Sequence, residues 1–404
     1  MRVLVADKFP ERQLTRLRKR GHDVRYEPKL DAEDLPGSIA DTEVLVVRST
    51  EVSAEVIDRG PHVGLIVRAG AGTNTIDVDA ASARGVYVAN IPGKNSVAVA
   101  ELTMGLILAL DRRIPDNVAE LRDENWRKSE FAKARGLMGR RLGIIGLGSI
   151  GIEVATRARA FGMKLAGVER GDRSPTRRQK LEDLGVKLYP DLDSMLPECD
   201  VVTIHVPSTA DTRGMVNRSF LGSMKDGACL VNTSRGDVVV AEELLETLEE
   251  RDLWVALDVF PDEPAAGEAE YNSALAKHPR VYGTHHIGAS TEQAQEAIAR
   301  QVIKVIDHYC DGAVRNTVNL AEPMAHTTVI GIRHVDQVGV LSRVFSVLRG
   351  ADINVEHMEN HIFQGAHTAK AVMHVHGDFN DAVRKELADL EAVFDVAVLR
   401  EESS

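Results

Sequence analysis

Short apolar runs alternate with segments of helical periodicity along most of the chain. This alternation is typical of a parallel β-sheet whose strands are joined by crossover helices. In the first part of the chain it predicts strands at residues 2–6, 44–47, 65–67 and 87–89. A helix is expected at residues 11–20, where Gly21 supplies a stop signal.

A second, denser region of the same kind follows a long helix predicted from about residue 95 to residue 110. Its strands are expected at residues 142–145, 165–168, 201–205, 229–232, 254–258 and 281–282. An amphipathic helix at residues 292–310 comes after the last of them. We therefore predict two Rossmann-like, doubly wound parallel-sheet domains, one discontinuous (residues 1–94 and 291–320) and one continuous (residues 95–290).

The last part of the chain has a different order of elements. Residues 319–325, which include Pro323, are expected to form a linker. Beyond them the pattern predicts strands at 328–332, 353–357, 367–374 and 394–399, and helices at 338–348 and 381–390. This β-α-β-β-α-β order describes a ferredoxin-like α+β module, here residues 326–404, which usually serves binding or regulation.

Composition and charge narrow the choice of partners. A chain of 404 residues has room for two or three domains. The formal net charge of −12 is spread without long like-charged blocks, which disfavours nucleic acid as a partner. The three cysteines, Cys199, Cys229 and Cys310, offer no metal-binding spacing. The N-terminus lacks an apolar signal core and the apolar stretch 97–110 contains Glu101, so we expect a cytoplasmic protein without a membrane partner.

A glycine-rich motif indicates a dinucleotide site. Residues 146–151, Gly-Leu-Gly-Ser-Ile-Gly, lie between a predicted strand and a predicted helix. In this context glycines allow a tight turn and bring backbone amides and a helix N-terminus to a pyrophosphate. Glu169, after the next strand, is placed to accept hydrogen bonds from the ribose hydroxyls of NAD. Arg170 and Arg173 keep NADP open as an alternative, because they could hold a 2′-phosphate. The expected contacts are Gly146, Gly148, Ser149, Ile150, Gly151 and Glu169.

The remaining strands of this region end in residues suited to the same site. Ligands of open α/β sheets bind at the carboxyl ends of the strands. At these ends we expect further cofactor contacts from Val206, Pro207, Thr233, Asp258 and Ala289.

Three other residues in these loops have the chemistry to oxidise a 2-hydroxy acid. The guanidinium of Arg235 would fix a carboxylate through paired hydrogen bonds. The imidazole of His286 would take the hydroxyl proton as hydride departs, supported by the carboxylate of Glu263. Each residue alone has an ordinary interpretation as a surface salt bridge, a turn residue or a cap. Their joint placement after successive strands favours a catalytic set.

The chain resembles the D-isomer-specific 2-hydroxyacid dehydrogenases over residues 1 to about 320. The matching motifs, in order, are GLGSIG, NTSRG, DVFPDEP and HHIGAS. The resemblance implies an NAD-dependent dehydrogenase in which Arg235 binds and polarises the 2-oxo acid. It also implies that His286 is the general acid and base, and that Glu263 supports the protonated histidine. His285 departs from the family pattern, which usually has proline there.

The N-terminal loops resemble those of family members that oxidise 3-phospho-D-glycerate to 3-phosphohydroxypyruvate, the first step of serine biosynthesis. The resemblance implies the same activity here. Backbone amides around Gly70 suit a carboxylate, and Arg48 suits a distal phosphate. In the family, Trp126 and Lys128 would lie at a subunit contact of a homodimer or homotetramer. The candidate substrate contacts are Arg48, Ser49, Arg68, Gly70, Asn95 and Lys128.

The C-terminal module resembles an ACT domain, a small amino-acid-sensing unit. The resemblance places His334, Asp336 and Asn354 at an effector site. Asp336 stands where serine-sensing relatives have asparagine, and Val338 replaces their proline. An aspartate would still bind an amino group but would repel a carboxylate, so the resemblance implies an amino-acid effector without implying serine.

Two other functions stay open. A glyoxylate or hydroxypyruvate reductase, or another 2-oxo acid reductase of the same family, would discriminate only weakly for a phosphate. A non-catalytic NAD-sensing interaction protein would bind NAD without turnover, because fold alone does not fix function. Formate dehydrogenases share the fold, but their chemistry needs no proton relay, which makes Glu263 unexpected there.

Overall fold

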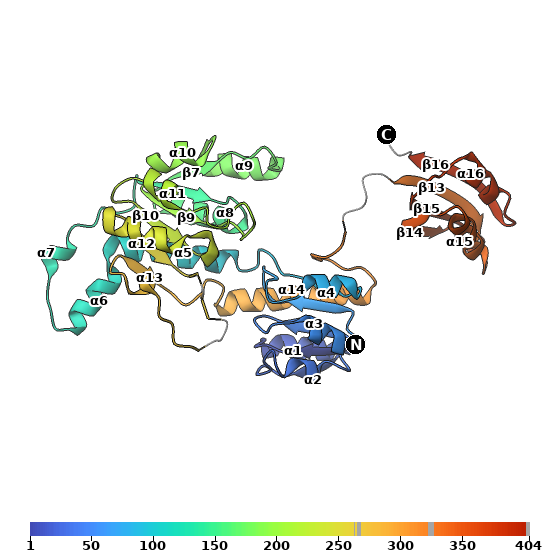
Figure 1. Ribbon diagram of the computed structural model, residues 1–404, viewed down its shortest axis with the longest axis horizontal. Coiled ribbons are helices and arrows are strands. Elements are labelled where there is room, and N and C mark those ends of the chain that lie inside the picture. Colours follow the sequence, from blue (N-terminus) through green and yellow to red (C-terminus); the bar gives the residue numbers. More distant parts are fainter. Residues whose placement is uncertain (262, 265–267, 322–326, 401–404) are drawn as a thin grey trace. The chain divides into compact units, whose positions relative to one another are not determined.

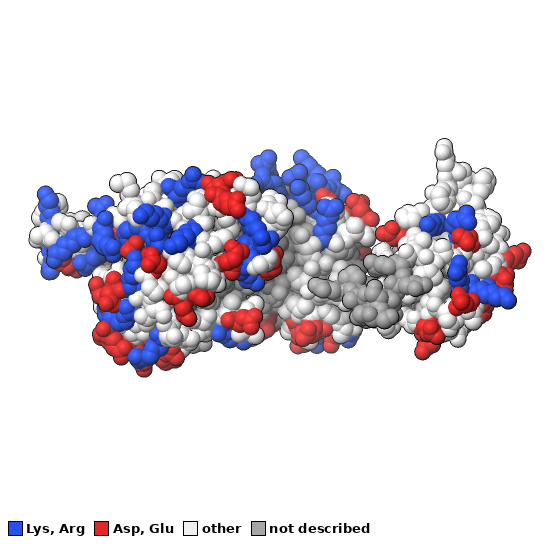
Figure 2. All heavy atoms as spheres, turned by 90° about the horizontal axis from the view of Figure 1, so that it is seen from above, with Lys and Arg blue, Asp and Glu red and all other residues white. Residues whose placement is uncertain are grey.

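The computed structural model of the protein describes residues 1–261, 263–264, 268–321 and 327–400 (Figure 1). The chain divides into two compact units, Met1–Asn319 and Leu320–Ser404. Most of the linker predicted at residues 319–325, including Pro323, lies outside the described residues. Figure 2 shows basic and acidic side chains mixed over much of one face, as expected from a charge that is spread along the sequence.

The first sheet lies in the Met1–Asn319 unit and contains five parallel strands. Their order is β2-β1-β3-β4-β5. The strands are β1 (Arg2–Val5), β2 (Asp23–Tyr26), β3 (Val44–Val47), β4 (Leu65–Arg68) and β5 (Tyr87–Ala89). One face packs against α1 (Glu11–Lys19) and α14 (Glu292–Cys310). The other face packs against α2 (Leu35–Ser38), α3 (Ala54–Arg59) and α4 (Val78–Ala83).

Helix α14 is the late segment that completes this first half. Its apolar side chains Ile298, Val302 and Ile306 are buried in one cluster with strand residues such as Val3 and Val67. The amphipathic pattern of residues 292–310 therefore corresponds to a helix that covers a sheet built more than 200 residues earlier, from strands such as Arg2–Val5.

The second sheet contains seven parallel strands in the order β12-β11-β10-β9-β6-β7-β8. They are β6 (Arg141–Ile145), β7 (Lys164–Val168), β8 (Val186–Tyr189), β9 (Val201–Ile204), β10 (Cys229–Asn232), β11 (Trp254–Leu257) and β12 (Val281–Gly283). The strand order reverses between β6 and β9. In doubly wound sheets such a reversal opens a crevice at the carboxyl edge, which is where ligands bind.

Helices cover both faces of the second sheet. One buried cluster joins it to α5 (Ser96–Arg112), α8 (Ser149–Ala160) and α9 (Pro175–Leu184). A second buried cluster joins the sheet to four helices that follow β8, which are α10 (Leu192–Met195), α11 (Arg218–Ser223), α12 (Ala241–Glu250) and α13 (Ala274–Lys277). Among the described residues no helix is long and apolar enough to cross a membrane.

Two helices extend from the second sheet as an arm. Arg113 has a left-handed backbone (φ 49°), which separates α5 from α6 (Ile114–Arg122). No residue of α6 is buried, and Trp126, just before α7 (Lys128–Phe131), is 80% exposed. Figure 1 shows α6 and α7 projecting away from the sheet. Lys128, the first residue of α7, therefore lies on this arm.

The C-terminal unit is an antiparallel sheet with helices on one face. Its elements are β13 (Thr328–Val335), α15 (Val340–Gly350), β14 (Asn354–Ile362), β15 (Thr368–His376), α16 (Asp381–Ala388) and β16 (Val393–Arg400). The strand order β14-β15-β13-β16 is that of a ferredoxin-like module. The predicted fold class, two doubly wound parallel sheets and a C-terminal ferredoxin-like module, is therefore confirmed.

Candidate active site

The glycine-rich turn fits a dinucleotide pyrophosphate. Gly146 has a left-handed backbone (φ 94°), and a Cβ there would lie 2.3 Å from the carbonyl oxygen of His205. A Cβ on Gly151 would lie 2.1 Å from the carbonyl oxygen of Gly146. A Cβ on Gly148 would have no neighbour within 4 Å, so open space remains before the N-terminus of α8, where Ser149 and Ile150 begin the helix. Free amides and open space at a helix N-terminus are what a pyrophosphate requires.

His205 supports this turn from the end of β9. Its side chain is buried, and Nε2 lies 3.0 Å from Oγ1 of Thr203. Burial lowers the pKa of His205 to about 3, from an ordinary value of 6.5. The imidazole is therefore neutral in the folded protein throughout the range in which an exposed histidine gains a proton.

Acid should weaken the fold through His205, because the unfolded chain binds a proton below pH 6.5 and the folded chain does not. The contribution is absent above pH 6.5 and grows as pH falls towards about 3, by at most about 1.4 kcal/mol per pH unit. We expect His205→Gln to flatten the pH dependence of the unfolding free energy between neutral pH and mild acid. Denaturant unfolding at several pH values measures the slope, and His62→Gln, at an exposed position, is the matched control. An unchanged slope in His205→Gln would contradict the assignment.

The other predicted cofactor contacts lie around the same edge of the sheet. Val206 Cγ1 would be 3.1 Å from a Cβ on Gly146, so it borders the turn. Thr233 Oγ1 lies 3.0 Å from Oγ1 of Thr103 on α5, in a buried pair. Pro207 follows Val206 and its carbonyl oxygen accepts a hydrogen bond from Thr212, and Ala289 lies half-buried after β12. Glu169 follows β7 and its backbone amide donates to the carbonyl oxygen of Tyr189 on β8.

Asp258 shapes the loop that carries His286. Its side chain is 1% exposed and accepts hydrogen bonds from Oγ1 of Thr284 (2.6 Å) and from the amides of Ile287 and Gly288 (2.9 Å each). Its carbonyl oxygen accepts a bond from the amide of His286 at 2.7 Å. The structure thus uses the Asp258 carboxylate to fix the loop backbone, a role that a strand-end position alone does not reveal.

His286 and Glu263 form a hydrogen-bonded pair. Nδ1 of His286 lies 2.6 Å from Oε1 of Glu263, and both side chains are partly exposed. His286 has φ 50°, a left-handed conformation that is uncommon for a residue with a Cβ. Burial opposes ionisation of Glu263, but the hydrogen bond and charge of His286 prevail and hold the pKa of Glu263 below 4.5. The pair is an ionised carboxylate that orients an accessible imidazole.

Arg235 lies in the loop after β10, opposite the first sheet's glycine loop. Its Nη1 donates to the carbonyl oxygen of Ser234 at 2.6 Å, and its Nη2 would lie 2.9 Å from a Cβ on Gly72. A Cβ on Gly236 would lie 2.0 Å from the carbonyl oxygen of Phe260, so the chain needs glycine directly after this arginine. The guanidinium is consequently oriented by the backbone and faces the first half of the unit.

Arg48 and Arg68 bring two more guanidinium groups to this region. Burial, with the charges of Arg235 and Arg48, lowers the pKa of Arg68 to about 10. A Cβ on Gly70 would lie 2.0 Å from Nη1 of Arg68, so the glycine loop wraps closely around that side chain. Nη2 of Arg48 lies 3.5 Å from Oγ of Ser290, near the His286 loop. Three mutually repelling cations held together favour an anionic ligand between them.

Comparison with known proteins agrees with this geometry. Residues 104–288 match the NAD binding domain of the D-isomer specific 2-hydroxyacid dehydrogenases. D-3-phosphoglycerate dehydrogenase of Methanocaldococcus jannaschii is 39% identical over 76% of this chain and 57% of the relative. Hydroxypyruvate reductase of Thermotoga maritima is 40% identical over 69% of this chain and 88% of the relative. The structure of cofactor (NAD+) bound 3-phosphoglycerate dehydrogenase of Entamoeba histolytica is 27% identical, covering 80% of this chain and 99% of that one, with a TM-score of 0.65.

The chain belongs to the D-isomer specific 2-hydroxyacid dehydrogenase family. NAD is the cofactor, as expected from the glycine-rich turn and Glu169. The chain spans 57% and 59% of the length of two archaeal phosphoglycerate dehydrogenases that it matches. The family match on its own therefore does not identify the substrate.

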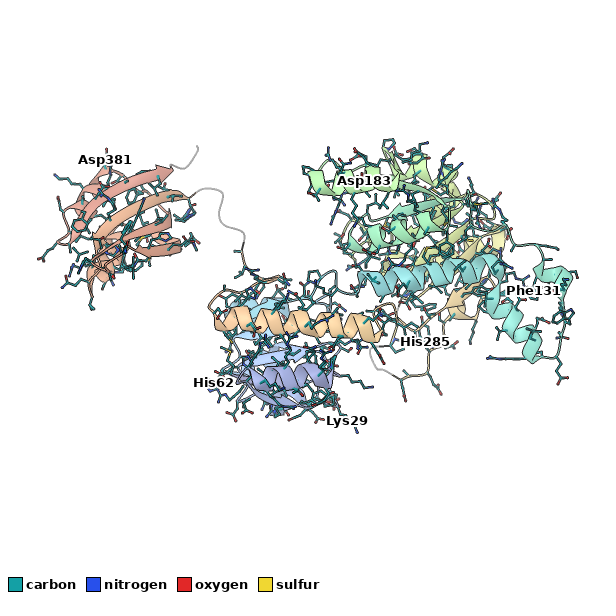
Figure 3. The ribbon with its side chains drawn as sticks, turned by 180° about the vertical axis from the view of Figure 1, so that it is seen from behind. Lys29, His62, Phe131, Asp183, His285 and Asp381 are labelled. Atoms are coloured by element: carbon teal, nitrogen blue, oxygen red, sulfur yellow. The ribbon has the colours of Figure 1, made fainter. Side chains whose placement is uncertain are left out.

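Within this family member, the predicted substrate residues do not all come together. Figure 3 shows Phe131, at the end of α7, far from His285, which precedes His286. Lys128 begins the same short helix and is exposed, so within one chain it stays away from the site. Asn95 precedes α5 and its carbonyl oxygen accepts the amide of Val99. Ser49 lies beside Arg48 in the loop after β3.

The predicted effector residues lie in the C-terminal unit. His334 is 1% exposed, with Nδ1 2.8 Å from the carbonyl oxygen of Val335 and Nε2 3.3 Å from Oδ1 of Asn360. Asp336 follows β13 and its amide donates to the carbonyl oxygen of His367. Asn354 begins β14, an edge strand, and donates to Glu356.

Asp7 is a site residue that the sequence prediction missed. Its Oδ2 accepts bonds from the amides of Arg48 (2.6 Å), Ser49 (3.0 Å) and Thr50 (3.0 Å). These bonds fix the loop that carries the Arg48 guanidinium. The available signal was position: Asp7 follows the first strand, at the carboxyl edge of the sheet, where functional groups of α/β proteins gather.

Proposed function

We propose that this protein oxidises 3-phospho-D-glycerate to 3-phosphohydroxypyruvate with NAD, the first step of serine biosynthesis. The observation that carries the proposal is the group of Arg48, Arg68 and Arg235, in which Nη2 of Arg48 lies 3.5 Å from Oγ of Ser290 in the loop that follows His286. A substrate with both a carboxylate and a phosphate satisfies more of this positive charge than a simple 2-hydroxy acid does. Relatives bearing the name D-3-phosphoglycerate dehydrogenase support the same choice.

The proposed catalytic roles follow from which side-chain atoms of the site already have hydrogen-bond partners. Glu263 engages Nδ1 of His286, which leaves Nε2 to accept the proton of the substrate's C2 hydroxyl. Arg235 holds the carboxylate and polarises the developing C2 carbonyl. Bound NAD supplies the hydride acceptor. In the reverse direction His286 returns its proton to the C2 oxygen, and Glu263 stabilises the imidazolium before that transfer.

The two predicted domains of the Met1–Asn319 unit would bind different ligands. We assign substrate binding to residues 1–94 with 291–320, and NAD binding to residues 95–290. Arg48, Ser49, Arg68, Gly70 and Asn95 would contact the substrate, while Lys128 would act at the site of a partner subunit in a homodimer or homotetramer. The cofactor contacts would be Gly146, Gly148, Ser149, Ile150, Gly151, Glu169, Val206, Pro207, Thr233, Asp258 and Ala289.

The C-terminal unit would be regulatory. Residues 326–404 would form an ACT-like domain that takes an amino-acid effector near His334, Asp336 and Asn354. Its ferredoxin-like topology supports this assignment. A cytoplasmic location is part of the same proposal.

A specific observation favours one second candidate, reduction of hydroxypyruvate. The Thermotoga maritima hydroxypyruvate reductase is 40% identical, and the chain covers 88% of its length. That substrate carries no phosphate, so it would leave Arg48 without a partner. The two candidates therefore differ in what Arg48 does.

The test is NADH formation from 3-phosphoglycerate at alkaline pH, beside D-glycerate and 2-hydroxyglutarate, with NADP in parallel. We expect 3-phosphoglycerate to be preferred, and Arg48→Met to lower its kcat/KM by about 100-fold while changing D-glycerate turnover little. Arg12→Met, on the exposed side of α1, is the matched control. Equal turnover of 3-phosphoglycerate and D-glycerate, with neither rate changed by Arg48→Met, would favour the reductase. NAD binding without any turnover would favour an NAD-sensing interaction protein.

A further inference from the structure

The carboxylate of Glu169 is held by one of its two oxygens. Oε1 accepts hydrogen bonds from the amide of Arg170 (2.9 Å) and from Nη1 of Arg173 (3.2 Å). Within the described part of the chain, no residue donates a hydrogen bond to Oε2. The Glu169 side chain is 46% exposed. The protein therefore fixes one oxygen and presents the other to solvent at the carboxyl end of β7.

Arg173 and Arg170 differ sharply although both belong to the same loop. The side chain of Arg173 is only 7% exposed, and its Nη2 donates to the carbonyl oxygen of Val168. The Arg170 side chain is 71% exposed and lies 3.4 Å from Asp172. Arg173 is thus a nearly buried cation with two protein partners, whereas Arg170 is a solvated surface group.

We propose that Arg173 selects NAD over NADP by orienting Glu169, and that the same guanidinium is a latent 2′-phosphate site masked by Glu169. The ribose diol of NAD donates hydrogen bonds, which suits a fixed carboxylate with one free oxygen. A 2′-phosphate is an anion that Glu169 repels. The guanidinium of Arg173, which could offset this repulsion, is already paired with Oε1 of Glu169.

Removing the Glu169 carboxylate takes away the anionic partner of the Arg173 guanidinium. A nearly buried guanidinium that loses its carboxylate is left with one carbonyl partner, which is costly. A phosphate at the same place restores a charge-assisted pair. The inference rests on the proposed contact between Glu169 and the ribose of the cofactor, but it does not depend on the proposed substrate.

The experiment measures dissociation constants of NADH and NADPH, without substrate, by nicotinamide fluorescence and calorimetry. For Glu169→Ser we expect NADH to bind about 10-fold more weakly and NADPH at least about 10-fold more tightly than in the parent. For Arg173→Met, which keeps the apolar stem, we expect NADH to weaken about 10-fold with no gain for NADPH. Far-UV circular dichroism and Tm check that each variant folds.

Two double variants decide between the arginines. Glu169→Ser with Arg173→Met should lose the NADPH gain, and Glu169→Ser with Arg170→Met should keep it. The proposal is overturned if the gain survives loss of Arg173, if it disappears with Arg170, or if Arg173→Met leaves NADH affinity unchanged. Should Arg173→Met not fold, Arg173→Lys tests the same role, because it keeps a cation but loses the second donor. NADH binding should then recover only in part, and full NADH affinity in Arg173→Lys would equally overturn the proposal.

Discussion

Replacing His286 with asparagine is expected to lower kcat by about 1,000-fold while leaving the dissociation constant of NADH within about twofold of the parent value. Nδ1 of His286 is bound to Glu263 at 2.6 Å, so Nε2 is the ring nitrogen left to take the hydroxyl proton. Asparagine tolerates the left-handed backbone at this position (φ 50°), so the loop should keep its shape. Stopped-flow and steady-state rates, with NADH fluorescence for binding, measure the two effects.

His285→Asn is the matched control, because it makes the same change at the preceding, exposed residue. It should leave kcat close to that of the parent. A large loss in His285→Asn together with turnover by His286→Asn would move the acid–base role to His285. A loss of NADH binding in His286→Asn would instead indicate that the loop held by Asp258 had collapsed.

Most of the fold could be predicted because central strands and packed helices carry strong periodicity. Among the strands of the described residues, β2 (Asp23–Tyr26) and β8 (Val186–Tyr189) were not predicted, and both lie at sheet edges. Their burial alternates or is partial, so they contain no continuous apolar run. An apolar run reports burial on both faces of a sheet, and the sequences DVRY and VKLY of these two strands interrupt it with Arg25 and Lys187.

The site was predictable in composition but not in geometry. Spacing and motif order select Arg235, Glu263 and His286 as candidates, and the structure places Glu263 and His286 in direct contact. No sequence pattern indicates that Asp258 uses its carboxylate on loop amides, or that Asp7 holds the loop of Arg48. Such bonds depend on where distant loops meet, which tertiary packing decides.

Arg235→Lys is expected to lower kcat/KM by about 100- to 1,000-fold for every 2-hydroxy acid that the protein accepts. Lysine keeps the charge but loses the planar fork, and the fork here is oriented by the carbonyl oxygen of Ser234 and directed at the Gly72 loop. Because Arg235 would hold the carboxylate common to all these substrates, phosphorylated and unphosphorylated acids should lose activity equally. Arg48→Met should instead spare the unphosphorylated acid.

The comparison uses kcat/KM for 3-phosphoglycerate and D-glycerate in each variant, with Arg213→Lys as the control. Arg213 is 67% exposed and pairs with Asp237, so its replacement should change neither value. Equal losses in Arg235→Lys and selective loss in Arg48→Met would divide the arginines into a carboxylate site and a phosphate site. A loss confined to 3-phosphoglycerate in Arg235→Lys would place the phosphate, rather than the carboxylate, at Arg235. The proposed orientation of the substrate would then have to be reversed.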